Sequence, residues 1–349
     1  MDTQPLAIAP WEPYPTADGS ITFLSSEFGE HFHSLKGAWD EALIKFVGPT
    51  QLAPLAAERD SIRILDICYG LGYNSAAALM VIWSIAPQCR VQWLGLELDP
   101  SVAIAALPEV IAQLQRSPGT SLPPGTLGPS QEHAIVFTAE AATRTAQVLT
   151  HLAQQGSDRT DDFEGTLRWG DARQTFGQGR AENPPGQEIS GGKNRVDSGQ
   201  DLTFDAIFLD PFSPPQCPQL WTVEFLTAVA RSLAPQGYLA TYSCAAAVRS
   251  ALQEAGLELG ASPPFGRRWP GTVAAYPRCG ETNPRLPPLS LQELEHLQTR
   301  AAVPYRDRQG TDSRDVVLAR RRQEQERSPL EPTSRWKRRW FGDCRASHR

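Results

Sequence analysis

The stretch Ile62–Asn74, IRILDICYGLGYN, decides the fold because it joins a strand, a glycine turn and the start of a helix. Its apolar first part is typical of a buried parallel strand, and the run then breaks at Gly70-Leu71-Gly72. The residues that follow, SAAALMVIW, are mostly good helix formers. This order of elements opens a Rossmann-like sheet. Because glycine lacks a Cβ, a ligand can approach the turn closely.

Acidic residues follow two further apolar segments. Glu97 and Asp99 end the segment Val91–Pro100, where an acid can accept hydrogen bonds from both hydroxyls of a ribose. Asp171, in RWGDAR, is placed to accept from an adenine amino group. NAD and S-adenosyl-L-methionine (SAM) both carry these groups, and three acidic strand ends in order favour SAM. The glycine pair alone is a weak signal, and any one of the acids alone can be an ordinary solvated loop residue.

The next buried strand, Phe204–Leu209, ends in Asp210-Pro211-Phe212-Ser213-Pro214. We expect its carboxyl end beside the glycine turn, where an open α/β sheet binds its ligand. Asp210 supplies an acceptor and Phe212 a flat face. The loop resembles the Asp-Pro-Pro-aromatic loop of amino-group methyltransferases, which orients an NH2 group toward the methyl of SAM. Alignment accelerates such a transfer, and a carboxylate helps to deprotonate the amine. A proline-capped strand end without chemistry is the alternative.

Composition limits the class of protein. The 349 residues suffice for one large domain with attachments or for two domains, and the net charge of −6 argues against a general polyanion binder. Six scattered cysteines without a CxxC pair argue against zinc, and His31 and His33 lack an evident third ligand, so we expect no metal. The sequence shows neither a signal peptide nor a run of about 18 apolar residues, so we expect no membrane contact and a cytoplasmic location.

The C-terminal part of the chain changes in charge. From Arg314 to Arg349 basic residues outnumber acidic ones about two to one, with aromatic residues interleaved in SRWKRRWFGDCR. Basic side chains pair with phosphates and tryptophan stacks on bases, so Trp336, Lys337 and Arg338 are candidates for RNA contact. A solvated or membrane-surface amphipathic end is the alternative. Two further candidates for phosphate contact lie at the turn of an expected last hairpin, Pro264–Tyr276: Arg267 and Arg268.

Several segments in order resemble the methyltransferase domain of the tRNA 5-methylaminomethyl-2-thiouridine biosynthesis (MnmC-type) family, over about residues 17–276. They are ADGSITFLSSEFGEHFHS, GAWDEALIKFV, DICYGLGYN, WGDAR, FDAIFLDPFSP, LWTVEFL, GYLATYSCAAAVRSALQEAG and PFGRR. The resemblance implies a Rossmann-like class I SAM-dependent methyltransferase, an α/β fold whose seven-stranded, mostly parallel sheet ends in an antiparallel hairpin. It also implies methylation of the aminomethyl group of 5-aminomethyl-(2-thio)uridine at the wobble position of tRNA.

The resemblance assigns roles to matching positions. The SAM-binding turn matches at Asp66, Gly70, Gly72 and Asn74, the ribose acid at Glu97, the adenine-side acid at Asp171 and the catalytic-loop acid at Asp210. Phe212 is the aromatic residue of that loop, and Pro211 lies between the two. Glu41 falls where the N-terminal helix of the family carries an acid. Two positions depart from the family pattern, because Cys68 replaces the first glycine of the motif and Pro211 replaces a glycine. The first change suggests a wider turn, and both changes bear on the substrate more than on the cofactor.

The composition of the segments, together with the extent of the resemblance, predicts the organisation of the chain. We expect an N-terminal hairpin and helix in residues 1–48, the methyltransferase domain in residues 49–276 and a basic, partly disordered extension in residues 277–349. Inserts near 116–132 and 176–202 are expected to be flexible loops of the sheet, and the first has no evident packing residues. The FAD-dependent oxidase half of the family has no counterpart here, so we expect a stand-alone methyltransferase. The sequence predicts no oligomeric state.

Three other functions compete with this one. An aminopropyltransferase shares the fold and also presents an amine to a sulfonium, but CYGLGYN lacks the middle acid of the usual GGGDGG turn. Another small amine is an alternative acceptor. A degenerate SAM fold that only binds tRNA or protein fits the basic tail, although the intact Gly70, Gly72, Glu97 and Asp210 argue against decay. A Rossmann dehydrogenase lacks an evident His-Asp or Tyr-Lys pair.

Overall fold

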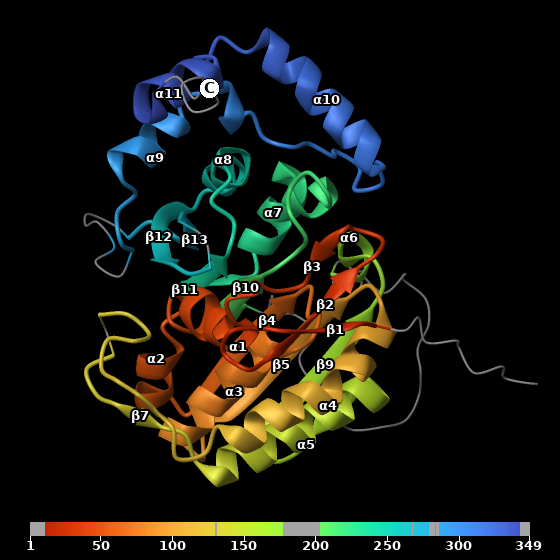
Figure 1. The fold of residues 1–349 in the computed structure, drawn as a ribbon, viewed down its shortest axis with the longest axis vertical. Coiled ribbons are helices and arrows are strands. Elements are labelled where there is room, and N and C mark those ends of the chain that lie inside the picture. The colour runs from red at the N-terminus through yellow and green to blue at the C-terminus, as the bar shows by residue number, and fades with distance from the viewer. Residues whose placement is uncertain are drawn as a thin grey trace, which may run out of the picture.

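One eight-stranded sheet, with helices on both faces, forms the centre of the computed structural model (Figure 1). The structure describes residues 11–129, 131–176, 203–266, 268–278, 283 and 286–342. The strands lie in the order β12 (Glu258–Pro264), β13 (Pro270–Ala275), β11 (Leu233–Thr241), β10 (Phe204–Leu209), β4 (Ser61–Ile67), β5 (Arg90–Glu97), β9 (Phe163–Trp169) and β8 (Ser157–Arg159).

Strand direction confirms the predicted fold class. The five strands from β11 to β9 run parallel, and β12 and β13 form the antiparallel end. Two details differ from the sequence-based expectation. The short β8 adds an eighth, antiparallel strand beside β9. The terminal hairpin begins at Glu258 rather than Pro264, because the short strand after Gly256 is itself its first half.

The alternation of apolar side chains along β4 explains how the sheet is covered. Ile62 and Ile64 belong to one apolar cluster and Leu65 and Ile67 to the other. Burial on both faces stabilises a parallel strand of this kind. The first face is covered by α1 (Ala38–Glu41), η1 (Ala42–Val47), α2 (Leu52–Glu58), α3 (Tyr73–Ile85), α4 (Pro100–Arg116) and α5 (Ala139–Gln155), and the second by α7 (Val223–Ala230) and α8 (Ala246–Glu254). None of the described helices is long and apolar enough to span a bilayer.

The N-terminal segment forms a small sheet of its own. Its strands β1 (Pro13–Pro15), β2 (Ile21–Ser25) and β3 (Glu30–His31) pair antiparallel, as expected for the predicted hairpin. In Figure 1 this sheet lies beside the central strands β4 and β10. It is therefore placed to form a wall near the carboxyl ends of the central strands.

The first predicted insert carries packing side chains. Within it the short strands β6 (Ser121–Leu122) and β7 (Ile135–Val136) pair, and Leu127 is buried. The side chain of Gln131 bonds four backbone groups, including the Leu127 amide at 2.7 Å. The expectation that this segment has no packing residues is therefore wrong, because one leucine and one amide anchor it. The second insert, 176–202, lies outside the described residues apart from Phe176.

The C-terminal extension is helical over much of its described length. It contains α9 (Leu291–His296), the 3-10 turn η4 (Arg300–Ala302), α10 (Arg314–Arg327) and α11 (Thr333–Phe341), and it lies beyond α7 and α8 (Figure 1). A capping box of Ser290 and Glu293 opens α9. Tyr305 and Val317 join the apolar cluster on the second face of the sheet. The extension is thus packed onto the domain through buried side chains.

Candidate active site

A cavity of about 350 Å³ lies between the glycine turn, the carboxyl end of β10 and the N-terminal hairpin. This volume is in the range of small-molecule sites. Strand register brings its walls together, since the Asp210 N–H donates to the Ile67 carbonyl at 3.1 Å and the Cys68 and Tyr69 N–H groups donate to the Leu96 carbonyl. Three sites predicted from separate segments therefore meet at one edge of the sheet.

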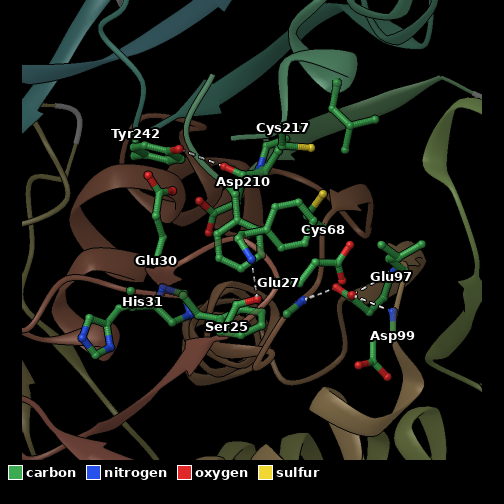
Figure 2. A pocket seen from close by; sticks show the side chains of 18 of the residues that line it. Ser25, Glu27, Glu30, His31, Cys68, Glu97, Asp99, Asp210, Cys217 and Tyr242 are labelled. Atoms are coloured by element: carbon green, nitrogen blue, oxygen red, sulfur yellow. Dashed lines mark hydrogen bonds between the residues drawn. The ribbon is translucent and has the colours of Figure 1, made fainter. Parts of the chain in front are cut away.

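The charged groups that line the cavity are mainly acidic. Its wall carries carboxylates from four regions, and no Lys or Arg of the described chain lines it. The six acids are Glu27, Glu30, Glu41, Glu97, Asp99 and Asp210, and Figure 2 shows all but Glu41 with labels around the pocket. Low-dielectric walls focus such a field, so the cavity attracts cations and repels anions such as phosphate.

Glu97 links the end of β5 to the glycine turn. Its Oε2 accepts from the Gly70 N–H at 2.7 Å, and its Oε1 accepts from the N–H groups of Leu98 and Asp99 at 2.8 and 3.0 Å. Burial raises the pKa of this carboxyl although the three backbone bonds oppose the rise. The acid predicted to hold a ribose thus lies in the cavity wall with a fixed orientation.

The glycine turn has a compact left-handed geometry. Gly70 lines the cavity with a φ of 56°, and a Cβ there would come within 3.3 Å of the Phe32 ring. Cys68 also lines the cavity and has a φ of 65°, a backbone that favours glycine. The residue that departs from the family motif therefore keeps the backbone conformation that a glycine adopts there, with a half-buried thiol added. Gly72 is needed for packing, since a Cβ would meet the Tyr69 hydroxyl at 2.4 Å.

Three residues predicted to bind the cofactor, Asp66, Gly72 and Asn74, do not line this cavity. Asp66 is fully buried under the turn, where its Oδ2 accepts from the Ser75 hydroxyl at 2.6 Å. Asn74 is also buried, and its Nδ2 donates to Asp210 Oδ2 at 2.8 Å. Asn74 therefore orients the catalytic-loop acid, and Asp66 supports the turn from below. The motif includes both positions but does not distinguish direct contact with a ligand from support of the turn and the loop.

The loop after β10 is held from several sides. Asp210, Pro211 and Phe212 all line the cavity, and the Tyr242 hydroxyl donates to the Pro211 carbonyl at 2.9 Å (Figure 2). The Phe212 ring stacks on Phe28 at 4.4 Å between centroids. One face of the ring predicted to contact a base is therefore already covered.

The N-terminal hairpin supplies site residues that the sequence did not reveal. The Glu30 carboxylate accepts from both the N–H and the hydroxyl of Ser213, so the hairpin is tied to the loop after β10. Phe28 and Phe32 surround the Phe212 ring. No local motif marks these positions, because their role depends on a contact about 180 residues away along the chain.

A second cavity of about 300 Å³ adjoins the first, since both are lined by Glu27, Phe28, Cys68, Glu97, Leu98, Cys217 and Leu220. Asp171, which was predicted to accept from the adenine amino group, lines this cavity, but both of its oxygens accept from the Arg173 guanidinium at 2.6–3.1 Å. Arg173 also donates to Asp307 of the C-terminal extension at 2.9 Å. Gln219 lines the same cavity, and its buried Oε1 makes no hydrogen bond within the described chain. An orphaned acceptor of this kind is costly unless a ligand satisfies it.

The remaining predicted substrate contacts separate into three groups. Glu41 lines the first cavity, where its Oε2 accepts from the Ser34 N–H at 2.8 Å. Arg268 and Lys337 line a different cavity, beside the terminal hairpin. Arg338 is exposed on α11, and Arg267 lies outside the described residues. None of the described members of the last two groups lines the acidic cavity.

Trp336 is a correction to the predicted RNA contacts. Its side chain is only 5% exposed, its ring stacks on His296 at 4.0 Å, and its indole N–H donates to the Gln292 carbonyl. An indole buried in this way anchors α11 to α9 and has no free face for a base. The pattern of alternating Trp and basic residues does not reveal which tryptophan packs inward.

Known proteins resemble this chain over most of its length. A family model for S-adenosyl-L-methionine-dependent methyltransferases matches residues 193–277. An uncharacterised protein of Methanocaldococcus jannaschii is 26% identical over 321 residues, which cover 89% of this chain and 72% of that protein. The tRNA 5-methylaminomethyl-2-thiouridine biosynthesis bifunctional protein MnmC of Cupriavidus necator is 27% identical, with 83% of this chain and 38% of MnmC covered.

A solved structure extends the similarity to the fold. The crystal structure of MnmC2 from Aquifex aeolicus matches with a TM-score of 0.67 and 28% identity, and the match covers 91% of this chain and 86% of that one. The chain spans less than two-fifths of the bifunctional MnmC of Cupriavidus necator. Fold, family model and relatives agree: the chain is an S-adenosyl-L-methionine-dependent methyltransferase that is similar to MnmC and MnmC2.

Proposed function

We propose that this methyltransferase acts on the nitrogen of an aminomethyl group, carried by 5-aminomethyl-(2-thio)uridine at the wobble position of tRNA. The acidic cavity is the observation that carries the proposal. Six carboxylates line it and no Lys or Arg of the described residues does, which favours an acceptor that arrives as an ammonium. A phenol or a carboxylate acceptor would gain nothing from such a wall. The names of the MnmC relatives supply the tRNA nucleoside, and a tRNA substrate implies a cytoplasmic location.

The residues present fit the cofactor. Gly70 leaves room at the turn, Glu97 presents a carboxylate in the wall, and the buried Gln219 Oε1 lacks a partner in the described chain. In this arrangement Glu97 holds the ribose hydroxyls and the second cavity receives the adenine. When bound, SAM supplies an electrophilic methyl group on a sulfonium.

Asp210 is placed to prepare the acceptor nitrogen. An alkylammonium must lose a proton before its nitrogen has a lone pair for the new C–N bond. The Asp210 carboxylate lines the cavity and is oriented by Asn74, so it can hold the amine and accept a proton. The clamp of Glu30 on Ser213 fixes the loop that carries Asp210, which limits misalignment of the nitrogen.

Gln219 is expected to accept a hydrogen bond from the adenine amino group, because Asp171 is already engaged by Arg173. Gln219→Leu should weaken SAM binding about tenfold, equivalent to about 1.4 kcal/mol, as measured by calorimetry. An SAM analogue whose purine lacks the amino group should bind wild type and variant alike. Gln216→Leu is the matched control, since that amide already accepts from Arg314 in the same cavity. An equal loss of SAM affinity in both variants would show that Gln219 does not accept from the adenine amino group.

The proposed function is tested by transfer of labelled methyl from SAM to tRNA that carries 5-aminomethyluridine. Label at the wobble nucleoside, found after digestion and chromatography, supports the proposal. Label on small amines but not on tRNA would favour another amine methyltransferase, and transfer of an aminopropyl group from the decarboxylated cofactor would favour an aminopropyltransferase. SAM binding without any transfer to tRNA or amines would leave a non-catalytic tRNA-binding module as the better interpretation.

A further inference from the structure

A separate cavity of about 470 Å³ lies between the terminal hairpin and helices α9 and α11. It is built from the C-terminal extension on one side and from the ends of the central strands on the other. Its wall includes Cys244 after β11, Arg268 and Trp269 at the hairpin turn, and Lys337 and Phe341 on α11. Neither the cofactor nor the acceptor amine of the proposed reaction needs this space.

The charge of this cavity is opposite to that of the active site. The guanidinium of Arg249 is buried and neutralised by Glu293 at 2.8 Å, so this pair contributes little net charge. Arg268 and Lys337 are exposed, and neither forms an ion pair with another described residue. The cavity therefore presents two cations without a described carboxylate partner, although the Arg268 guanidinium lies over the Trp269 ring at 5.7 Å from its centroid. The active site presents six carboxylates instead.

Aromatic rings form part of the same wall. Phe341 is 37% exposed, and its ring meets the rings of Trp269 and Trp336 edge to face at 5.9 and 5.6 Å between centroids. His296 stacks on Trp336, and burial together with Arg249 and Lys337 lowers its pKa to about 4. The imidazole is thus neutral near pH 7, so the positive charge comes from Arg268 and Lys337. Flat rings beside exposed cations suit a nucleotide better than a bare anion.

The two cavities are neighbours through the end of β11. Tyr242 lines the acidic cavity and Cys244 lines the cationic one. Two residues span at most about 7 Å of chain, so the walls of the two cavities come close at this point. One chain of ribonucleotides can therefore reach both.

These observations address a difficulty in the proposed reaction. An RNA substrate must place an aminomethyl base in a cavity whose carboxylates repel the phosphates of the same strand. The adjoining cations offer those phosphates a site. We propose that the cavity of Arg268 and Lys337 binds a nucleotide that flanks the target uridine, with the cations on its phosphate and aromatic rings beside its base. This inference rests on the proposed RNA substrate.

The test compares Arg268→Ala/Lys337→Ala with wild type, using an anticodon stem-loop that carries 5-aminomethyluridine. The double variant should raise the Kd and the KM for this RNA about tenfold and leave kcat and SAM affinity unchanged. Losing two phosphate contacts to a single strand should also reduce the slope of log K against log salt by about 1.4. The free nucleoside, which has no phosphate, should be methylated equally by both proteins.

A matched control removes the same charge elsewhere on the extension. Arg322→Ala/Arg327→Ala changes two exposed arginines of α10 outside the cavity and should keep wild-type RNA affinity and salt slope. The exchange Arg268→Lys/Lys337→Arg should restore most of the affinity. If the two double variants Arg268→Ala/Lys337→Ala and Arg322→Ala/Arg327→Ala show the same RNA affinity and the same salt slope, the inference is overturned even if the RNA is methylated. Salt-dependent RNA binding through the cavity without methylation would instead keep the site and remove the proposed function.

Discussion

Asp210→Asn is expected to lower the kcat of methyl transfer by about 10²- to 10⁴-fold, the range for loss of a general base. The change is nearly isosteric, and its amide oxygen can still accept from Asn74, so the loop should keep its geometry. What disappears is the negative charge beside the acceptor nitrogen and the capacity to take its proton. SAM affinity should stay within about threefold of wild type, because Glu97 and the second cavity are untouched.

Two measurements separate this role from a structural one. Calorimetry with SAM and thermal unfolding should match wild type, while single-turnover transfer to the modified tRNA falls. Asn74→Ala should give a smaller loss of kcat, since it leaves the carboxylate and removes only its orienting bond at 2.8 Å. Near-wild-type turnover by Asp210→Asn would remove Asp210 from the mechanism and leave alignment as the main source of rate.

The parts of the site that could be predicted from sequence are the residues that directly follow a strand. A glycine turn after a strand and an acid after the next strand predict their own positions, because parallel strands end at one edge of the sheet. Glu97 and Asp210 lie where this rule puts them. Cys68 shows that the turn can determine the backbone against the preference of the residue, since its φ of 65° is one that cysteine rarely adopts.

The parts that could not be predicted depend on contacts across the chain. Glu30 reaches Ser213 only because the N-terminal hairpin folds over the loop after β10. Trp336 and Trp340 stand four residues apart on α11, yet the first is buried and the second is 37% exposed. Spacing and composition are similar for both, so only the position of α9 decides which one packs.

Asp66→Asn is expected to change how stability depends on pH. Burial raises the pKa of Asp66 to about 7, against an unfolded value of 3.8, although a bond from Ser75 opposes the rise. The folded chain therefore holds this proton more tightly than the unfolded chain. The cost of ionising Asp66 is absent below pH 4, grows as the pH rises and is complete above pH 7. From the difference in pKa, that cost reaches about 4 kcal/mol.

The asparagine variant removes this titration and keeps an oxygen that can accept from Ser75, so it should flatten the fall in unfolding free energy between pH 5 and 8. Its NH2 replaces the unpartnered Oδ1, which offsets part of the gain, so a net stabilisation of about 1–3 kcal/mol is expected at pH 8. Urea unfolding at each pH measures both quantities. Ser75→Ala is the opposing control, because losing its bond raises the pKa of Asp66 further and moves the pH dependence upward. If the slope of the unfolding free energy against pH is the same in Asp66→Asn as in wild type, Asp66 does not titrate in this range. Weakened SAM binding by the variant would mean that Asp66 contributes to the cofactor site from beneath the turn.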